Sequence, residues 1–563
     1  MKCFSRMVCL LLSILLLAGC ASAPAETALA EKITHATETA QAAETTQTTI
    51  ETVLKTETAL AKIRALGESP DDNYRTFYEI FVYSFCDSDG DGIGDLQGVI
   101  SKLDYLQELG ITGIWLMPVN PSQSYHKYDV ANYYAIDPAY GTLGDMEQLL
   151  EACEARGIKV IMDLVLNHSA NNHPWFLAAS RYLAELPAGA QPDPRQCAYV
   201  DYYYFNREGG PGCHEVPGAP GWYYEGVFSP HMPDLKLENQ TLRAEIRDIM
   251  EYWLGKGVHG FRLDAVKEFY SGNNTANVEV LSWLMETARE IKPDVYLVGE
   301  AWDNFAALQT FYESGLTSFF AFPFGNSDGK IVKVLRAAGS ERDVQSFART
   351  LELADSTYFA IHPGYIDAPF LSNHDVGRIA GFVNRDPAKT KLAAAMNIFM
   401  SGSVFIYYGE EIGMVGSGND PSKRAPMYWN TARDNGTTNP PPECQLPDEY
   451  PFGSLEEQVH DDLSVYNYYR QAIAIRNAIP AMARGRTTEE VPLNVGCVSA
   501  FRKTWEDSSC IVLMNISPEA AQADLSGYTD WTLAAGLSVS ADEITLSGTV
   551  LDLPAYGVAV LVK

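Results

Sequence analysis

The sequence predicts a (β/α)8 barrel that carries an inserted subdomain after its third strand and is followed by a C-terminal antiparallel β domain. From about residue 73 to 485, short apolar segments alternate with amphipathic segments of helical period. Several apolar segments have almost no polar positions, which is typical of parallel strands buried on both faces. Repeated alternation of this kind favours a barrel. A long stretch rich in Gly, Pro and Tyr interrupts it once, and the helical period ends near residue 485.

Eight apolar segments are the expected barrel strands. In chain order they are YEIFVYSF (78–85), ITGIWLMPV (111–119), KVIMDLVLN (159–167), GFRLDA (260–265), VYLVGEAW (295–302), SFFAFPF (318–324), FLSNHD (370–375) and VFIYYGEE (404–411). Amphipathic helices are expected between them, for example over 96–110, 144–157 and 242–257.

These segments divide the folded chain into three parts. The barrel is expected over residues 73–168 and 234–485, and the inserted subdomain over 169–233. Residues 486–563 alternate with period two and contain turn residues, which predicts a C-terminal β-sandwich domain.

The first residues are typical of a bacterial export signal. Lys2 and Arg6 precede an apolar run that is too short to span a bilayer as a mature helix. The run ends in Leu-Ala-Gly-Cys at 17–20, which resembles a bacterial lipobox. The resemblance implies that Cys20 is lipidated and becomes the mature N-terminus.

Residues 1–19 are therefore the predicted lipoprotein signal peptide. The alternative is an ordinary signal peptide cleaved after Ala23 or Ala25. Residues 20–72 are poor in aromatic residues and rich in Ala, Thr and Glu, which predicts a flexible tether. The folded part would then lie outside the cytoplasm, at the cell surface, and would contact the membrane only through the lipid anchor.

Charge and cysteine usage narrow the class of partner. The net charge is -31 and the sequence pI is about 4.7, which disfavours nucleic acid and anionic membrane surfaces as partners. A neutral substrate suits this charge. Cys197 and Cys213 are candidates for a loop disulfide, because an exported protein meets an oxidising compartment.

Polar residues gather at the ends of four predicted strands. They are Asp163 and His168 on the third, Arg262 and Asp264 on the fourth, Glu300 on the fifth, and His374 and Asp375 on the seventh. Active sites of such barrels lie at the C-terminal ends of the strands, so these side chains are expected at one mouth. A helix cap or a loop hydrogen bond would explain one such residue at a strand end. Packing does not explain polar residues at the ends of four strands together.

Four segments carry a resemblance to a known family. DLVLNH (163–168), GFRLDAVKE (260–268), GEAW (299–302) and FLSNHD (370–375), in this order, resemble the four signature segments of the α-amylase family of glycoside hydrolases. The resemblance covers roughly residues 74–563. The inserted stretch also contains MPDLK, which resembles the marker of an intermediate subgroup between oligo-1,6-glucosidases and neopullulanase-like enzymes. That marker ends in Asn, where this sequence has Lys236.

The resemblance implies the roles of the acids. Asp264 would be the nucleophile that forms a covalent glycosyl intermediate, and Glu300 the general acid and then the base. Asp375 would hold sugar hydroxyls as the ring flattens, and Arg262 would keep Asp264 ionised. Retaining hydrolysis needs two carboxyl groups about 5–5.5 Å apart, one ionised and one protonated. Neighbouring strands four and five can supply such a pair.

The resemblance also implies substrate contacts around the cleaved bond. They are Tyr128, His126, Asp163, His168, Arg262, Lys267, His374 and Arg378. Oligo-1,6-glucosidases usually have an Asp three residues before the stacking Tyr, where it grips a terminal glucose; here that position is Tyr125. Relatives specific for 1,6 bonds tend to have Val after the nucleophile, where this sequence has Ala265. Both differences favour an open cleft and endo attack on α-1,4 bonds.

An acidic loop predicts a metal site. The segment DSDGDGIGD places acids at alternating positions, with glycines that allow a tight turn. Hard cations such as Ca²⁺ prefer oxygen ligands of this kind, and Mg²⁺ can substitute. The loop resembles a metal-binding loop of this family branch, and its role would be structural. The alternative is an acidic, solvated turn. The predicted ligands are Asp87, Asp89, Asp91, the Ile93 carbonyl and Asp95.

The sequence therefore predicts a retaining, endo-acting α-amylase that hydrolyses α-1,4-glucosidic bonds of starch and maltooligosaccharides. An α-glucosidase, a neopullulanase-like hydrolase or a transglycosylase on the same scaffold is the alternative, and product analysis separates these. A non-catalytic glucan-binding barrel is disfavoured, because all three expected acids are present. The expected partner is an α-glucan and no nucleic acid, and the oligomeric state is left open.

Overall fold

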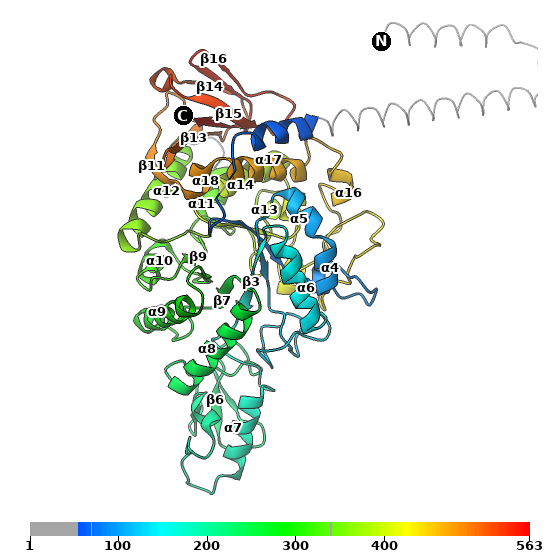
Figure 1. The fold of residues 1–563 in the computed structure, drawn as a ribbon, viewed down its shortest axis with the longest axis vertical. Coiled ribbons are helices and arrows are strands. Elements are labelled where there is room, and N and C mark those ends of the chain that lie inside the picture. The colour runs from blue at the N-terminus through cyan, green and yellow to red at the C-terminus, as the bar shows by residue number, and fades with distance from the viewer. Residues whose placement is uncertain (1–54, 69, 338–340) are drawn as a thin grey trace, which may run out of the picture. The chain divides into compact units, whose positions relative to one another are not determined.

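The computed structural model describes residues 55–68, 70–337 and 341–563 (Figure 1). Residues 58–563 form one compact unit. The predicted signal peptide, Cys20 and residues 21–54 of the predicted tether lie outside the described residues. Residues 58–64 are helical, and Leu60 and Ile63 of this helix are buried. The flexible tether predicted up to residue 72 is therefore wrong in its last part, because apolar side chains there pack on the domain.

The barrel sheet is parallel and closed. Its strands run in the order β10-β1-β2-β3-β7-β8-β9. Single parallel bridges, Phe320 to Ala368 and Phe370 to Phe405, connect β9 to β10 and take the place of the predicted seventh strand. The predicted (β/α)8 barrel is confirmed. The strands are β1 Thr76–Ile80, β2 Gly113–Leu116, β3 Lys159–Leu164, β7 Gly260–Leu263, β8 Tyr296–Gly299, β9 Ser318–Phe319 and β10 Val404–Tyr407.

The interior of the barrel changes from apolar to charged along the strands. Phe77 of β1 and Ile161 of β3 belong to a buried apolar cluster inside the barrel. Glu79 and Asp163 come two residues later and face the same interior, because alternate residues of a strand share a face. Asp163 is the register partner of Arg262 on β7. The charged layer therefore lies nearest the C-terminal ends of the strands.

Helices cover the outside of the barrel. The predicted helices over 144–157 and 242–257 are confirmed as α6 and α8, whereas the one over 96–110 is divided at Lys102 into α4 and α5. The bounds are α3 Val82–Phe85, α4 Leu96–Ser101, α5 Leu103–Leu109, α6 Leu143–Glu154, α8 Gln240–Gly255, α9 Asn274–Ile291, α10 Phe305–Tyr312, α11 Lys330–Arg336, α12 Glu341–Ile361, α13 Ile379–Phe382, α14 Pro387–Ile398, η2 Glu410–Ile412, α15 Asp420–Lys423, α16 Leu455–Gln458, α17 Val465–Ala478 and α18 Pro480–Arg484. Among the described residues, none of the helices combines the length and apolarity that a membrane span needs.

The first predicted strand is shorter than expected. It ends at Ile80, and the apolar residues after it form the short helix α3. Val82 and Phe85 lie three positions apart and are both buried on this helix. A short apolar run does not distinguish a strand from a buried helical turn, which explains the difference.

The inserted lobe follows β3 and the C-terminal domain follows α18. The lobe contains α7 Pro174–Glu185, η1 Ala198–Asp201 and a small sheet of β4 Phe205–Asn206, β6 Tyr223–Glu225 and β5 Cys213–Glu215. Cys197 and Cys213 are free thiols, so the expected loop disulfide is absent from the described residues. The C-terminal domain packs two antiparallel sheets, β11-β12-β13-β18-β15 and β14-β17-β16, as predicted. Its elements are β11 Arg486–Glu490, β12 Val498–Trp505, β13 Ser508–Asn515, β14 Ala521–Asp524, η3 Ser526–Tyr528, β15 Thr532–Leu537, β16 Thr545–Ser547, β17 Val550–Leu553 and β18 Val558–Val562.

Candidate active site

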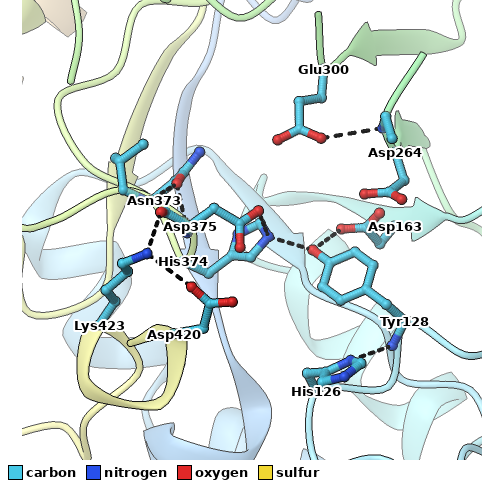
Figure 2. Close-up of polar contacts among 12 residues, drawn as sticks. His126, Tyr128, Asp163, Asp264, Glu300, Asn373, His374, Asp375, Asp420 and Lys423 are labelled. Atoms are coloured by element: carbon cyan, nitrogen blue, oxygen red, sulfur yellow. Dashed lines mark hydrogen bonds and ion pairs between the residues drawn. The ribbon is translucent and has the colours of Figure 1, made fainter. Parts of the chain in front are cut away.

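A cleft of about 770 Å³ opens at the C-terminal ends of the barrel strands. Its volume lies within the range of clefts that enclose organic ligands. Asp264, Glu300 and Asp375 all line it. Figure 2 shows Asp264 and Glu300 on one side of the site and Asp375 on the other. The structure therefore brings together the three acids that the sequence placed at separate strand ends.

One buried guanidinium joins three carboxylates beneath the cleft. Arg262 is fully buried, and its Nη1 lies 2.5 Å from Asp264 Oδ1 and 2.8 Å from Asp163 Oδ1. Its Nη2 lies 2.9 Å from Glu300 Oε2. Three acids around one cation favour a proton on one of them, because buried like charges repel. Arg262 therefore holds the side chains of Asp264 and Glu300 at neighbouring points of one cavity.

Two of the acids around Arg262 have a raised pKa: burial raises the pKa of Asp163, behind the cleft, to about 7, and Glu300 is the one of the two that lines the cleft. Burial raises the pKa of Glu300, and the charges of Asp264 and Asp375 add to this against the opposing charge of Arg262. Ala265 has a φ of 45°, a conformation that residues other than glycine seldom adopt, and this turns its N–H toward Glu300 Oε2 at 3.2 Å. The backbone after Asp264 is thus shaped around the carboxyl group of Glu300.

Asp375 lies in the opposite environment. Burial alone would raise the pKa of Asp375, but the charges of His374 and Arg424 lower it well below its usual range. Its Oδ2 is 3.0 Å from His374 Nε2, and its Oδ1 is 2.8 Å from Arg424 Nη2. Lys423 Nζ donates to the Asp375 carbonyl at 2.7 Å. Asp375 is therefore an ionised carboxylate held from several sides.

Arg424 was not predicted from the sequence. It lies 49 positions after its partner Asp375, beyond α15, in a segment without helical or strand period. The prediction that Arg378 contacts substrate is wrong. Arg378 is 1% exposed and donates from Nη1 to the Tyr408 carbonyl at 2.6 Å, so it stabilises the chain after β10.

The other predicted contact residues divide into two groups. His126, Tyr128, His168 and Lys267 line the cleft. Asp163, Arg262 and His374 are buried behind it and do not line it, so they hold the residues that do. Tyr128 Oη lies 2.6 Å from His374 Nε2 and donates to Asp163 Oδ2 at 3.2 Å (Figure 2).

Two imidazoles of the cleft are neutral near pH 7. Burial lowers the pKa of His126 to about 4, and the charge of Arg424 adds to this effect. Burial also lowers the pKa of His168. His168 Nε2 has no hydrogen-bond partner among the described residues, which leaves it free for a ligand hydroxyl. Neutral imidazoles and a Tyr side chain in the cleft wall suit an uncharged, hydroxyl-rich ligand.

Exposed aromatic rings on the cleft wall were also missed by the sequence. Phe228 of the inserted lobe is 50% exposed, and Trp302 is 44% exposed and stacks on Phe322 with ring centroids 5.1 Å apart. Both line the cleft. Lys267 Nζ donates to the Trp302 carbonyl at 3.1 Å and pairs with Asp303. Large apolar rings are usually buried, so two exposed rings in one cleft indicate contact with a ligand.

The acidic loop after β1 brings three of its four predicted carboxylates together. Ligand oxygens of Asp87, Asp89 and Asp95 lie within 4.8 Å of one another. Asp91 is outside this group and accepts from the Ile93 N–H at 2.7 Å. Oxygens of Asp87 also accept backbone N–H groups of the turn, at Gly90 (2.7 Å) and Gly92 (2.8 Å). The donor set is all oxygen and fits a hard cation such as Ca²⁺.

A comparison with known families assigns the chain. The family description "Alpha amylase, catalytic domain" matches residues 79–485, which include the barrel, the inserted lobe and the cleft. The chain belongs to the α-amylase family of glycoside hydrolases. It is therefore an enzyme that hydrolyses glycosidic bonds, as the signature segments implied.

Relatives with several activities share this fold. Alpha-amylase 3 of Dictyoglomus thermophilum is 37% identical over 444 residues, covering 78% of this chain and 84% of the relative. The probable oligo-1,6-glucosidase 2 of Bacillus subtilis is 31% identical over 496 residues, covering 72% and 84%. The solved structure of Eubacterium rectale Amy13B has a TM-score of 0.86 and 42% identity, covering 90% of this chain and 99% of that one. The α-amylase from H. orenii has a TM-score of 0.75 and 36% identity, covering 87% and 100%.

Proposed function

We propose that this enzyme is a retaining, endo-acting α-amylase that hydrolyses α-1,4-glucosidic bonds of starch and maltooligosaccharides. The observation that carries the proposal is the meeting of Asp264 and Glu300 at one guanidinium, in a cleft that also contains Asp375. Retaining hydrolysis needs one ionised and one protonated carboxyl group side by side. Burial and neighbouring charge favour the proton on Glu300.

The proposed reaction has two steps. Asp264 attacks the anomeric carbon while Glu300 gives its proton to the leaving oxygen, and a covalent glycosyl ester forms. Glu300 then takes a proton from water, the water attacks the same carbon, and Asp264 is released. Asp375 accepts hydrogen bonds from sugar hydroxyls, and the neutral His126 and His168 add further contacts. Only the leaving group and the water exchange protons with Glu300.

The contacts of Arg424, which lines the cleft, support endo attack. Its Nη1 lies 3.2 Å from the hydroxyl of Tyr125, the residue that replaces the terminal-glucose-gripping Asp of oligo-1,6-glucosidases. The Tyr125 ring packs edge-on against Phe81 and Tyr83. A hydroxyl already bonded to a cation is a weaker grip on a chain end than a free carboxylate. The exposed rings of Phe228 and Trp302 offer stacking surfaces for further sugars.

Product analysis tests the bond and the mode of attack. Amylose, pullulan and isomaltose are incubated separately, and the products are followed with time. We expect a mixture of oligosaccharides from amylose at early times and little cleavage of isomaltose. Glucose as the sole early product from amylose, or preferred cleavage of isomaltose, would contradict the proposal in favour of an α-glucosidase.

We also propose that the loop of Asp87, Asp89 and Asp95 binds Ca²⁺ and braces the mouth of the barrel. The loop is joined to a second segment, because Asp87 N–H donates to the Gly436 carbonyl and Asn439 N–H to the Gly92 carbonyl. An ion at about 1,000 times its Kd would stabilise the fold by about 4 kcal/mol. EDTA is therefore expected to lower the Tm, and added Ca²⁺ to restore it.

A matched pair of variants locates this ion. In Asp89→Asn the Tm should no longer depend on Ca²⁺. The control is Asp104→Asn, because Asp104 is an exposed acid of α5 that pairs with Arg156. The Tm of this control should respond to Ca²⁺ as that of the wild type does. A wild-type Tm that does not change with EDTA, Ca²⁺ or Mg²⁺ would exclude a metal site in this loop. A calcium response that survives in Asp89→Asn would place the ion elsewhere.

We further propose that the enzyme is a lipoprotein at the cell surface of a bacterium. The lipobox-like segment at 17–20 and the short apolar run before it support this proposal. Cys20→Ala is expected to move the activity from the membrane fraction to the soluble fraction. Membrane attachment that persists in Cys20→Ala would contradict lipidation at this residue.

A further inference from the structure

A buried carboxylate beneath the cleft has no part in the proposed steps. Glu79, near the end of β1, is 1% exposed, and its Oε1 lies 2.6 Å from His374 Nδ1. We propose that Glu79 is a positioning residue that keeps the His374 imidazole protonated and thereby fixes the hydrogen bonds that hold Tyr128 and Asp375 in the cleft. The catalytic consequence of this inference rests on the proposed function.

The strand register places Glu79 where it cannot be solvated. Phe77 and Glu79 face the barrel interior, and Glu79 is the register partner of Trp115 on β2. The backbone N–H of His374 also approaches Glu79 Oε1, at 3.4 Å. A carboxylate in such a place is costly unless a cation faces it. The imidazole of His374, which is fully buried, is the group within ion-pair distance.

The imidazole is held between two acids. Nδ1 faces Glu79, while Nε2 lies 3.0 Å from Asp375 Oδ2 and 2.6 Å from Tyr128 Oη. Burial alone would lower the pKa of His374, but Asp375 and Glu79 raise it to about 9. The groups that face this pair from the surrounding elements are Tyr128, Asp163, Arg262, Glu300, Asp375, Tyr407 and Arg424.

The proton on His374 decides the direction of the hydrogen bonds. An imidazolium donates from both nitrogens, so Nδ1–H serves Glu79 and Nε2–H serves Asp375 and the Tyr128 oxygen. The Tyr128 hydroxyl is then free to donate to Asp163, as the 3.2 Å contact shows. When the neutral imidazole keeps its proton on Nδ1 toward Glu79, the Nε2 lone pair faces the Asp375 carboxylate, and Tyr128 has to donate to Nε2 instead of Asp163. The ring of Tyr128 and the carboxylate of Asp375 would both lose their fixed positions.

The variant Glu79→Gln tests whether the charge of Glu79, and not only its hydrogen bond, is needed. The amide oxygen can still accept from Nδ1–H, so a purely structural role is preserved while the charge is removed. The matched control is Glu411→Gln, another fully buried acid of the barrel, which accepts from Tyr78 and Tyr105 and does not line the cleft. The His374 signal is followed by ¹³C NMR of the histidine Cε1 positions in the full chain, assigned with His374→Gln.

We expect His374 to titrate near pH 9 in the wild type and in Glu411→Gln, and at least one pH unit lower in Glu79→Gln. The ratio of kcat/KM of Glu79→Gln to that of the wild type on a maltooligosaccharide should then fall about threefold or more between pH 6 and 8.5. For Glu411→Gln this ratio should stay flat. Glu79→Asp, which keeps the charge, should restore much of the loss.

An unchanged His374 titration in Glu79→Gln would overturn the inference. So would a wild-type His374 that titrates at or below about 6.5, its ordinary value, and this second result does not depend on any variant being folded. The NMR measurement needs no substrate. If the wild type does not cleave α-glucans, the proposed function fails, whereas the titration still decides the role of Glu79.

Discussion

Replacement of Asp264 by Asn is expected to lower kcat/KM on amylose by about 10⁴-fold or more while the fold stays intact. The amide has nearly the shape of the carboxylate but cannot form the glycosyl ester. Arg262 keeps Asp163 and Glu300 as partners, so its buried charge is not left alone. Initial rates on amylose, together with circular dichroism and a thermal melt, check both parts of this expectation.

Asp367→Asn is the matched control. Asp367 is also a buried acid of the barrel, but it precedes the bridge at Ala368 and lies at the N-terminal end of the strands, away from the cleft. We expect its kcat/KM to stay within about threefold of the wild type. An Asp264→Asn enzyme with more than about 1% of wild-type activity would refute the assignment of the nucleophile.

Replacement of Glu300 by Gln is expected to lower kcat/KM on amylose by about 10²–10⁴-fold, because the leaving oxygen no longer receives a proton. The loss should be much smaller on α-maltosyl fluoride, since fluoride leaves without protonation. Hydrolysis of the intermediate should then be slow, and added azide should restore turnover and give an α-glycosyl azide, because two inversions retain the anomer. Equal losses on both substrates, without rescue by azide, would rule out an acid/base role for Glu300.

The pH dependence of kcat/KM also tests the acid role of Glu300. Burial raises the pKa of Glu300 above its ordinary value, so its protonated, donating form persists to higher pH than that of an exposed Glu. Wild-type kcat/KM on amylose is therefore expected to fall as pH rises through this raised pKa. The kcat/KM of Glu300→Gln on α-maltosyl fluoride should lack this fall.

Period and composition predicted the barrel because its strands are apolar on both faces. The same signal misled where an apolar run was short. Residues 82–85 belong to the first apolar segment, yet they form the short buried helix α3, and single bridges at Ala368 and Phe370 stand where the seventh strand was predicted. Hydrophobicity reports burial, whereas the backbone form of a short buried segment depends on neighbours distant in the sequence.

The acids of the site were predictable because each ends a predicted strand. Glu79 gave a comparable signal, since it is a charged residue in an apolar strand on the same face as Phe77, but it was not among the predicted site residues. Arg424 gave none, because its partner Asp375 lies 49 positions away and the segment has no period. The family resemblance implied that Arg378 contacts substrate, and the chain instead turns its guanidinium toward the Tyr408 carbonyl.

Trapping of the glycosyl intermediate tests the central claim most directly. The wild-type enzyme is incubated with 5-fluoro-α-maltosyl fluoride, whose ring fluorine slows release of the intermediate, and is digested for mass spectrometry. We predict a 5-fluoromaltosyl adduct on the peptide that contains Asp264, and none on this peptide in Asp264→Asn. An adduct on another carboxylate, or release of the inverted anomer without any adduct, would contradict the account.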